Sequence, residues 1–80
     1  MYYVYVLKSE SCDRYYIGHT ENIERRFIMH NGGKVRSTKA YRPWSLKHKE
    51  SFHTKQEAYK RELKIKSYKS GEAFKKLIEK

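Results

Sequence analysis

The 80-residue chain is long enough for one domain with a thin core, and its 15% aromatic residues argue against disorder. Lys and Arg number 19 against nine Asp and Glu, and the resulting formal charge of +10 favours a polyanionic partner, usually nucleic acid. The sequence has no apolar run long enough to span a membrane, no secretory signal and a single cysteine, so we exclude an internal disulfide and expect a cytoplasmic protein.

The first part of the chain predicts a β-hairpin. Residues 2–8 are rich in β-branched residues and tyrosines, and both faces of this strand look at least partly covered, which indicates a central strand. Residues 9–13 (SESCD) are typical of a turn, and residues 14–18 predict the second strand. If the two strands pair across this turn, Tyr5 and Tyr16 can both face the helix that follows.

A first helix is predicted after the hairpin. Thr20 can cap its N-terminus, and Ile23 and Phe27 lie one turn apart and form an inward stripe. Residues 31–33 (NGG) end the helix, because Asn and Gly tolerate the left-handed conformation at a helix C-terminus.

A basic loop and a third strand come next. Residues 34–42 have few apolar side chains and predict the loop. Residues 43–52, opened by a proline, predict a strand in which Trp44, Leu46 and Phe52 alternate imperfectly.

Two helices complete the chain. Residues 54–57 (TKQE) form a capping box, which starts a helix that extends to about Tyr68. Ser70 and Gly71 separate it from a short last helix, whose apolar side consists of Ala73, Phe74, Leu77 and Ile78. These elements predict an α+β fold, a small three-stranded antiparallel sheet flanked by helices, in a single domain over residues 1–80.

Two polar residues of the first helix lie close to its apolar stripe. Helical geometry places Arg26 and His30 one turn apart beside Ile23 and Phe27, whereas Arg25 points to the far side and into solvent. Arg26 and His30 should therefore border the sheet. The alternative for either residue is a side chain that extends from the margin of the helix into solvent.

The second helix carries an acid where a core residue is expected. Ala58, Glu62 and Ile65 fall on one face at spacings of four and three. A buried carboxylate needs a cation or a metal ion, because leaving it unpaired is costly. The alternative is a salt bridge from Glu62 to a neighbouring Lys or Arg.

These residues together resemble the GIY-YIG nuclease superfamily. YVY at residues 3–5 stands where that family has its first tripeptide, and YIG at residues 16–18 matches the second. Arg26 follows Tyr16 by ten residues and His30 by 14, which is the family spacing, and the Glu in EAYKRELKIK falls on Glu62. The likeness is to the stand-alone single-domain branch, with UvrC N-terminal-like and YhbQ-like relatives.

The resemblance implies a metal-dependent endonuclease that hydrolyses phosphodiester bonds in DNA, in repair or in processing of branched or damaged DNA. Glu62 would hold Mg²⁺ or Mn²⁺, with water and phosphate oxygens as the remaining ligands. Arg26 would grip the scissile phosphate. Tyr5 is the candidate general base, with a pKa lowered by Arg26 and a nearby cation, and His30 would take its proton onward. Tyr16 would hydrogen-bond the phosphate or share the role of base.

Further residues are expected to bind the nucleic-acid backbone and its bases. His19, beside the YIG motif, could contact nucleic acid or share the proton relay with His30. Tyr41 and Trp44 are possible stacking rings. The expected phosphate contacts of the basic loop are Lys34, Arg36, Lys39 and Arg42. A protein partner could supply substrate specificity.

Two other functions fit the sequence less well. A nucleic-acid-binding module could keep this fold and bind without cutting. A zinc-binding interaction domain is disfavoured, because the four histidines and Cys12 lack finger-like spacing.

Overall fold

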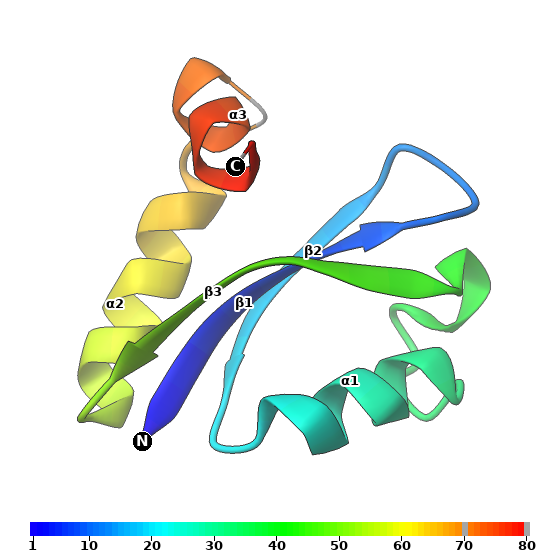
Figure 1. Ribbon diagram of the computed structural model, residues 1–80, viewed down its shortest axis with the longest axis horizontal. Helices are drawn as coiled ribbons and strands as arrows, with labels where there is room; N and C mark the ends of the chain where they lie inside the picture. The colour runs from blue at the N-terminus through cyan, green and yellow to red at the C-terminus, as the bar shows by residue number, and fades with distance from the viewer. Residues whose placement is uncertain (70, 80) are drawn as a thin grey trace.

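The computed structural model describes residues 1–69 and 71–79 and contains one sheet with helices on both faces (Figure 1). The strands are antiparallel in the order β2-β1-β3, which confirms the predicted three-stranded α+β fold and the central position of β1. The strands are β1 (Tyr2–Ser9), β2 (Tyr15–Thr20) and β3 (Trp44–Phe52). The helices are α1 (Ile23–Asn31), α2 (Lys55–Lys66) and α3 (Glu72–Ile78), and a short 3₁₀ helix spans Lys39–Tyr41.

Strand β1 supplies both layers of the core. Val4 and Val6 are fully buried on the face that α2 and α3 cover, where they pack with Ala58, Ile65 and Phe74. On the other face, Tyr5 and Leu7 pack with Trp44 and the apolar side of α1. Because successive side chains of a strand alternate, Tyr5 stands on the α1 face.

A β-bulge explains the imperfect alternation of β3. Val6 pairs with His48, whereas Leu7 pairs with Leu46, so one extra residue lies in β3 at this point. A one-residue shift reverses which side chains face which side of the sheet. Trp44 consequently joins the α1-side core, and Phe52 packs with the core under α2 and α3. Leu46, which pairs with Leu7, is 39% exposed on this edge strand.

The helix termini differ from the prediction in detail. Thr20 is not the N-cap of α1: β2 continues to Thr20, and the cap is Asn22, whose Oδ1 accepts a hydrogen bond from the Arg25 amide at 3.0 Å. The capping box of Thr54 and Glu57 is confirmed.

The prediction also differs from the structure at the end of α2 and on the apolar side of α3. Helix α2 ends at Lys66 rather than near Tyr68, and Ala73, predicted on the apolar side of α3, is exposed. Ser70, part of the predicted break before α3, lies outside the described residues. Within residues 1–69 and 71–79, no helix has the length and apolarity that a membrane span requires.

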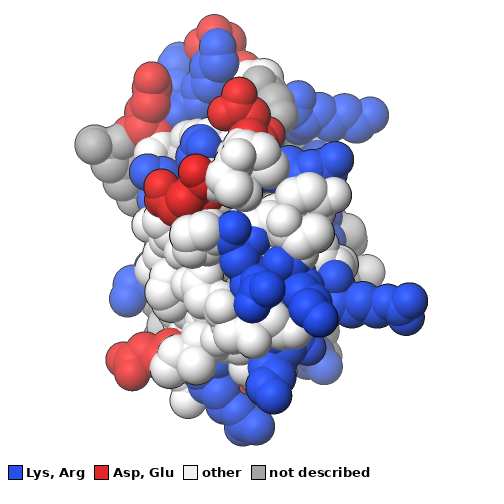
Figure 2. Space-filling view, turned by 90° about the vertical axis from the view of Figure 1, so that its right-hand side faces the viewer, with Lys and Arg blue, Asp and Glu red and all other residues white. Residues whose placement is uncertain are grey.

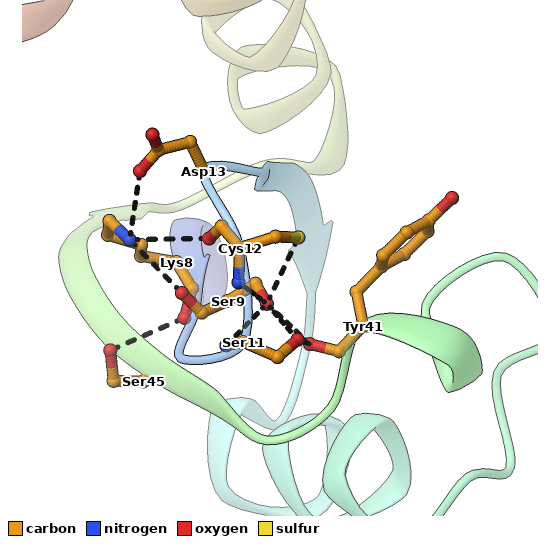
Figure 3. A network of polar contacts seen from close by, with 7 residues as sticks. All are labelled: Lys8, Ser9, Ser11, Cys12, Asp13, Tyr41 and Ser45. Atoms are coloured by element: carbon orange, nitrogen blue, oxygen red, sulfur yellow. Dashed lines mark hydrogen bonds and ion pairs between the residues drawn. The ribbon is translucent and has the colours of Figure 1, made fainter.

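A fully buried serine organises the turn between β1 and β2 (Figure 3). The Ser9 hydroxyl donates a 2.6 Å hydrogen bond to the Tyr41 carbonyl and accepts bonds from the amides of Ser11 and Cys12 at 3.1 and 3.3 Å. The turn is thereby joined to the 3₁₀ helix, although 32 residues separate Ser9 from Tyr41.

His30 and Thr38 form a second buried polar link, between the last turn of α1 and the loop that follows. His30 Nδ1 lies 2.8 Å from Thr38 Oγ1, and both side chains are at most 1% exposed. Trp44 Nε1 donates to the Thr38 carbonyl at 3.0 Å, so the loop is also tied to the start of β3. Burial, and secondly the charge of Arg26, lower the pKa of His30 to about 4.

Ser9→Ala should destabilise the protein by roughly 1–3 kcal/mol, because it leaves the Tyr41 carbonyl and two turn amides without their buried partner. Urea unfolding measures this loss. Ser45→Ala is the matched control, since Ser45 makes only a 3.4 Å bond to the Lys8 carbonyl in the same network, and it should cost under about 0.5 kcal/mol. Equal losses for both variants would contradict the role given to Ser9.

Acidification should destabilise the fold through His30. An unfolded histidine gains its proton near pH 6.5 and the folded His30 only near 4, so the unfolded state binds more protons between these values. The free energy of unfolding should fall by roughly 3 kcal/mol as the pH drops from about 6.5 to 4. Urea unfolding in pH steps tests this, and His30→Gln should flatten the curve in that window. An unchanged slope in the variant would assign the pH dependence to other groups.

Candidate active site

Two tyrosines and a histidine form an aromatic cluster on the α1 face of the sheet. The ring centroids of Tyr16 and His30 are 4.7 Å apart, those of Tyr5 and His30 5.9 Å, and those of Tyr5 and Tyr16 6.1 Å. Antiparallel pairing places Tyr5 opposite Gly18. A Cβ at Gly18 would lie 2.8 Å from the Tyr5 hydroxyl and 3.0 Å from the Tyr16 ring, so only glycine leaves room for both phenols here.

The hydrogen bonds around His30 determine which of its ring nitrogens carries the hydrogen. Thr38 Oγ1 donates to the Val35 carbonyl at 3.3 Å and therefore accepts from His30 Nδ1. In the neutral imidazole, Nε2 is then an acceptor, and it lies 3.1 Å from the Tyr5 hydroxyl. The Tyr5 proton thus points at a neutral base that is fully buried. His30 was expected to border the sheet, and it packs against Tyr5 and Tyr16 of the sheet, fully buried.

Arg26 lies beside both phenols, as the helical geometry predicted. A polar contact with the Tyr5 phenol raises the pKa of Arg26, burial opposes this, and Tyr16 adds a smaller increase. Arg26 also lines a cleft of about 330 Å³ at the start of α1, together with Asn22 and Arg25. Its guanidinium therefore stands between the phenols and a space that a phosphate could enter.

Tyr5 is a weaker acid than expected. Burial raises the pKa of Tyr5 to about 12, and the negative charges of Tyr16 and Glu62 act in the same direction. Arg26 lowers that pKa, which is the expected sign, but burial outweighs it. At pH 7 about one Tyr5 phenol in 10⁵ is ionised, so a basic Tyr5 needs its proton removed as it reacts.

Glu62 is the buried acid of α2, and two donors hold it. It is 7% exposed, with Oε1 at 2.5 Å from His19 Nδ1 and Oε2 at 2.7 Å from Lys66 Nζ. Burial raises the pKa of Glu62, but the hydrogen bonds from Lys66 and His19 together outweigh it, so the pKa lies below its ordinary value. Glu62 therefore carries its charge at neutral pH. The lysine salt bridge considered from the sequence is present, and it coexists with the contact to His19.

Tyr5 links the aromatic cluster on the α1 face to Glu62 on the α2 side of the sheet. Tyr5 and Tyr16 face α1, whereas His19 and Glu62 lie on the α2 side of β2. The Glu62 carboxylate is nevertheless close enough to Tyr5 for its charge to raise the phenol pKa, and Arg26 contacts the same phenol. The clefts beside Arg26 and His19 also adjoin, since residues 20–21 line both.

The donor set at Glu62 suits a cation that takes few ligands from the protein. Within residues 1–69 and 71–79, no group of three or more His, Cys, Asp and Glu side chains is placed to hold a metal ion. Mg²⁺ is commonly bound through one or two carboxylates, with water and substrate phosphates as its other ligands. Glu62 fits that pattern, and Lys66, whose side chain is 50% exposed, can leave the second carboxylate oxygen.

The basic side chains of residues 34–42 are exposed, whereas Trp44, an expected stacking ring, is buried. Lys34, Arg36, Lys39 and Arg42 all face solvent. Figure 2 shows Lys and Arg side chains gathered on the side of the molecule where this loop lies in Figure 1. The expected stacking role of Trp44 does not fit the structure, because its ring is 4% exposed and its Nε1 is bonded to the Thr38 carbonyl.

Three functional neighbours were missed from the sequence. Gly18 was visible as part of YIG, but its steric role depends on the pairing of β1 with β2. Lys66 lies four residues after Glu62, so the rule for helical neighbours could have found it. Thr38 gives no signal in a polar loop, since only the folded chain brings it to His30.

Comparison with known proteins identifies the family of the chain. Residues 1–75 match the GIY-YIG catalytic domain. UPF0213 proteins of Staphylococcus saprophyticus and Halobacterium salinarum are 41% and 42% identical, over 84% and 82% of this chain and 82% and 86% of theirs. A solution NMR structure of a UPF0213 protein from Bacillus halodurans matches with a TM-score of 0.50 and 32% identity, over 84% of this chain and 72% of that one.

The UPF0213 names assign no activity. The GIY-YIG domain is that of a nuclease superfamily, which implies a nucleic-acid substrate and, in general, a divalent metal ion. The motif residues, the fold and the extent of the match lead to one conclusion: the chain belongs to the GIY-YIG nuclease superfamily, alongside the small UPF0213 proteins.

Proposed function

We propose that this protein is a Mg²⁺- or Mn²⁺-dependent endonuclease that hydrolyses phosphodiester bonds in DNA. The observation that carries the proposal is the buried hydrogen-bond chain from Tyr5 through His30 to Thr38. A phenol bonded to a neutral imidazole can pass a proton inward as it accepts one from water. The contact of Arg26 with the Tyr5 phenol also places a cation beside this chain, where a phosphate could bind.

Arg26 binds the scissile phosphate in this proposal. Its contact with both phenols orients the guanidinium, and its cleft at the start of α1 is open to a ligand. A planar guanidinium can bind two phosphate oxygens and offset the charge that develops on them in the transition state. The position of Arg26 beside Tyr5 brings the attacking water, the base and the phosphate together.

The proton of the attacking water passes to Tyr5 as the Tyr5 proton moves to His30 Nε2. Because the Tyr5 pKa is about 12 and the His30 pKa about 4, the ionised phenol and the protonated imidazole are both unfavourable in the resting protein. Phosphate bound at Arg26 and its developing charge must therefore assist the transfer. Tyr16, whose ring lies beside both groups, is the other candidate for the base.

Glu62 would hold the divalent metal ion, and His19 orients the carboxylate. The ionised carboxylate accepts only, so His19 Nδ1 donates to it and keeps one oxygen fixed. When bound, the ion would supply Lewis-acid stabilisation of the phosphate oxygens. Lys66 must release the other oxygen first, since its ammonium lies 2.7 Å away.

The remaining assignments rest on the basic charge, on the single cysteine and on the resemblance to the family. Lys34, Arg36, Lys39 and Arg42 contact the DNA backbone, and the whole chain acts as one catalytic domain in the cytoplasm. The DNA processed is branched or damaged, and a protein partner directs the enzyme to it. A module that binds without cutting is the second candidate, favoured by the closed state of Glu62 between Lys66 and His19.

Purified protein should cut at least one of nicked, branched and single-stranded DNA with Mg²⁺ or Mn²⁺, and chelator should stop it. Glu62→Gln and Arg26→Ala should each lower the rate by about 10²–10³-fold, because each removes charge stabilisation from the transition state. Gel assays with end-labelled DNA measure this. Lys64→Ala is the control: it removes one positive charge from an exposed position of α2 that lines neither the Arg26 cleft nor the His19 cleft, and it should change the rate little. Salt-sensitive binding without cleavage on every substrate would favour the binding module.

Phenylalanine substitutions can identify the base. Tyr5→Phe should lower kcat by about 10²–10⁴-fold, whereas Tyr16→Phe should cost less and keep the pH profile. The relay starts from protonated Tyr5 and neutral His30, whose pKa values are about 12 and about 4, so log kcat of the wild type should stay flat from pH 6 to 9.5. Rates across this range measure the loss in each variant. A larger loss in Tyr16→Phe than in Tyr5→Phe would assign the base to Tyr16.

A further inference from the structure

Tyr59 is an exposed aromatic residue that the proposed mechanism does not use. It lies on α2, one turn before Glu62, and 50% of its surface is exposed. Its ring packs edge-on against His19, with the centroids 5.9 Å apart and the planes at 71°. An edge-to-face pair of this kind covers at most one face of the Tyr59 ring. A flat aromatic surface therefore remains free close to the buried acid.

A cleft lies beside His19, the residue that packs against the Tyr59 ring. His19, Tyr2 and Lys55 line a space of about 340 Å³ between the end of β2 and the start of α2, and Thr20 and Glu21 complete its lining. Lys55 lies four residues before Tyr59, so the two side chains project from the same side of α2. The region thus combines aromatic rings, one ammonium and one carboxylate, with polar groups along its walls.

We propose that Tyr59, with His19 and Lys55 beside it, forms a subsite that stacks one unpaired nucleobase next to the phosphate that is cut. The location rests on the proposed function, because His19 bonds Glu62 and so fixes the distance to the site of hydrolysis. The Lys55 ammonium pairs with the phosphate of the same nucleotide. The Glu21 carboxylate repels phosphate from the cleft and can accept hydrogen bonds from base amino groups.

An unpaired base fits this surface better than a base within a duplex. Bases inside a duplex are already stacked on both faces, so an exposed tyrosine ring has no face of theirs to contact. A nucleotide in a flap, gap or single strand can turn its base onto the ring. The subsite accordingly selects DNA with an unpaired nucleotide beside the scissile bond.

The test is a binding measurement in chelator, so that no cleavage occurs. Fluorescence anisotropy compares a twelve-nucleotide oligothymidylate, an abasic strand of the same length and a fully paired duplex. Tyr59→Ala should weaken binding of oligothymidylate by about 5- to 150-fold and leave the abasic strand and the duplex within about twofold. Tyr59→Phe should keep the affinity, because stacking needs the ring and not the hydroxyl.

Two controls separate stacking from charge and from folding. Leu63→Ala, at the next exposed apolar residue of α2, should leave all three affinities unchanged. Lys55→Ala should reduce the slope of log affinity against log salt by about 0.7, whereas Tyr59→Ala should not change that slope. Circular dichroism confirms that each variant is folded.

Equal affinity of Tyr59→Ala and wild type for oligothymidylate would overturn this inference, and so would an equal loss on the abasic strand. Failure of the proposed function is seen separately, as wild-type protein that binds oligothymidylate through Tyr59 and cuts no DNA. Cleavage by wild type with no effect of Tyr59→Ala on binding would remove the subsite and keep the nuclease.

Discussion

The hydrogen bond from Tyr5 to His30 is the interaction on which the site depends. It joins the central strand to the last turn of α1, and its continuation to Thr38 brings in the loop that carries four exposed basic residues. His30 is fully buried, and these two partners satisfy both of its ring nitrogens. The same bonds that satisfy a buried imidazole therefore set the orientation of the phenol.

The charges of the site are balanced without a substrate. Arg26 lies on the phenols, and Lys66 and His19 hold the carboxylate of Glu62. Burial keeps Tyr5 protonated and His30 neutral, so neither carries a charge that would need a partner. A bound phosphate and a divalent cation would change each of these balances at once, and this links substrate binding to the ionisation of the phenol.

The two faces of strand β2 carry different parts of the candidate site. Tyr16 and Gly18 face α1, whereas His19 faces α2 and contacts Glu62. At Gly18 the strand has no side chain, so the Tyr5 hydroxyl can approach the strand from the α1 face. Because side chains alternate along this edge strand, the next residue, His19, faces α2 and bonds Glu62.

Much of the fold could be predicted from local sequence patterns. Alternating tyrosines and β-branched residues predict the central strand, and the TKQE capping box predicts the start of α2, because these features depend on neighbours a few residues away. Thr20 was assigned wrongly, and the faces of β3 could not be assigned, for a related reason. A β-bulge places Trp44 and Phe52 on opposite faces of the sheet, and the continuation of β2 removes Thr20 from the helix; both result from pairing between strands.

The candidate site, like the fold, could be predicted from the sequence only in part. The resemblance to the GIY-YIG family, with the spacing of its motifs, suggested Tyr5, Tyr16, Arg26, His30 and Glu62, and a buried acid on an apolar helix face indicated a need for a cation. The sequence also determined the basic charge that favours nucleic acid. Only the tertiary structure decided that Thr38 orients His30, that burial raises the Tyr5 pKa, that Trp44 is hidden and that His19 bonds Glu62. Desolvation and contacts between distant segments exist only once the layers have packed, and no local pattern encodes their strength.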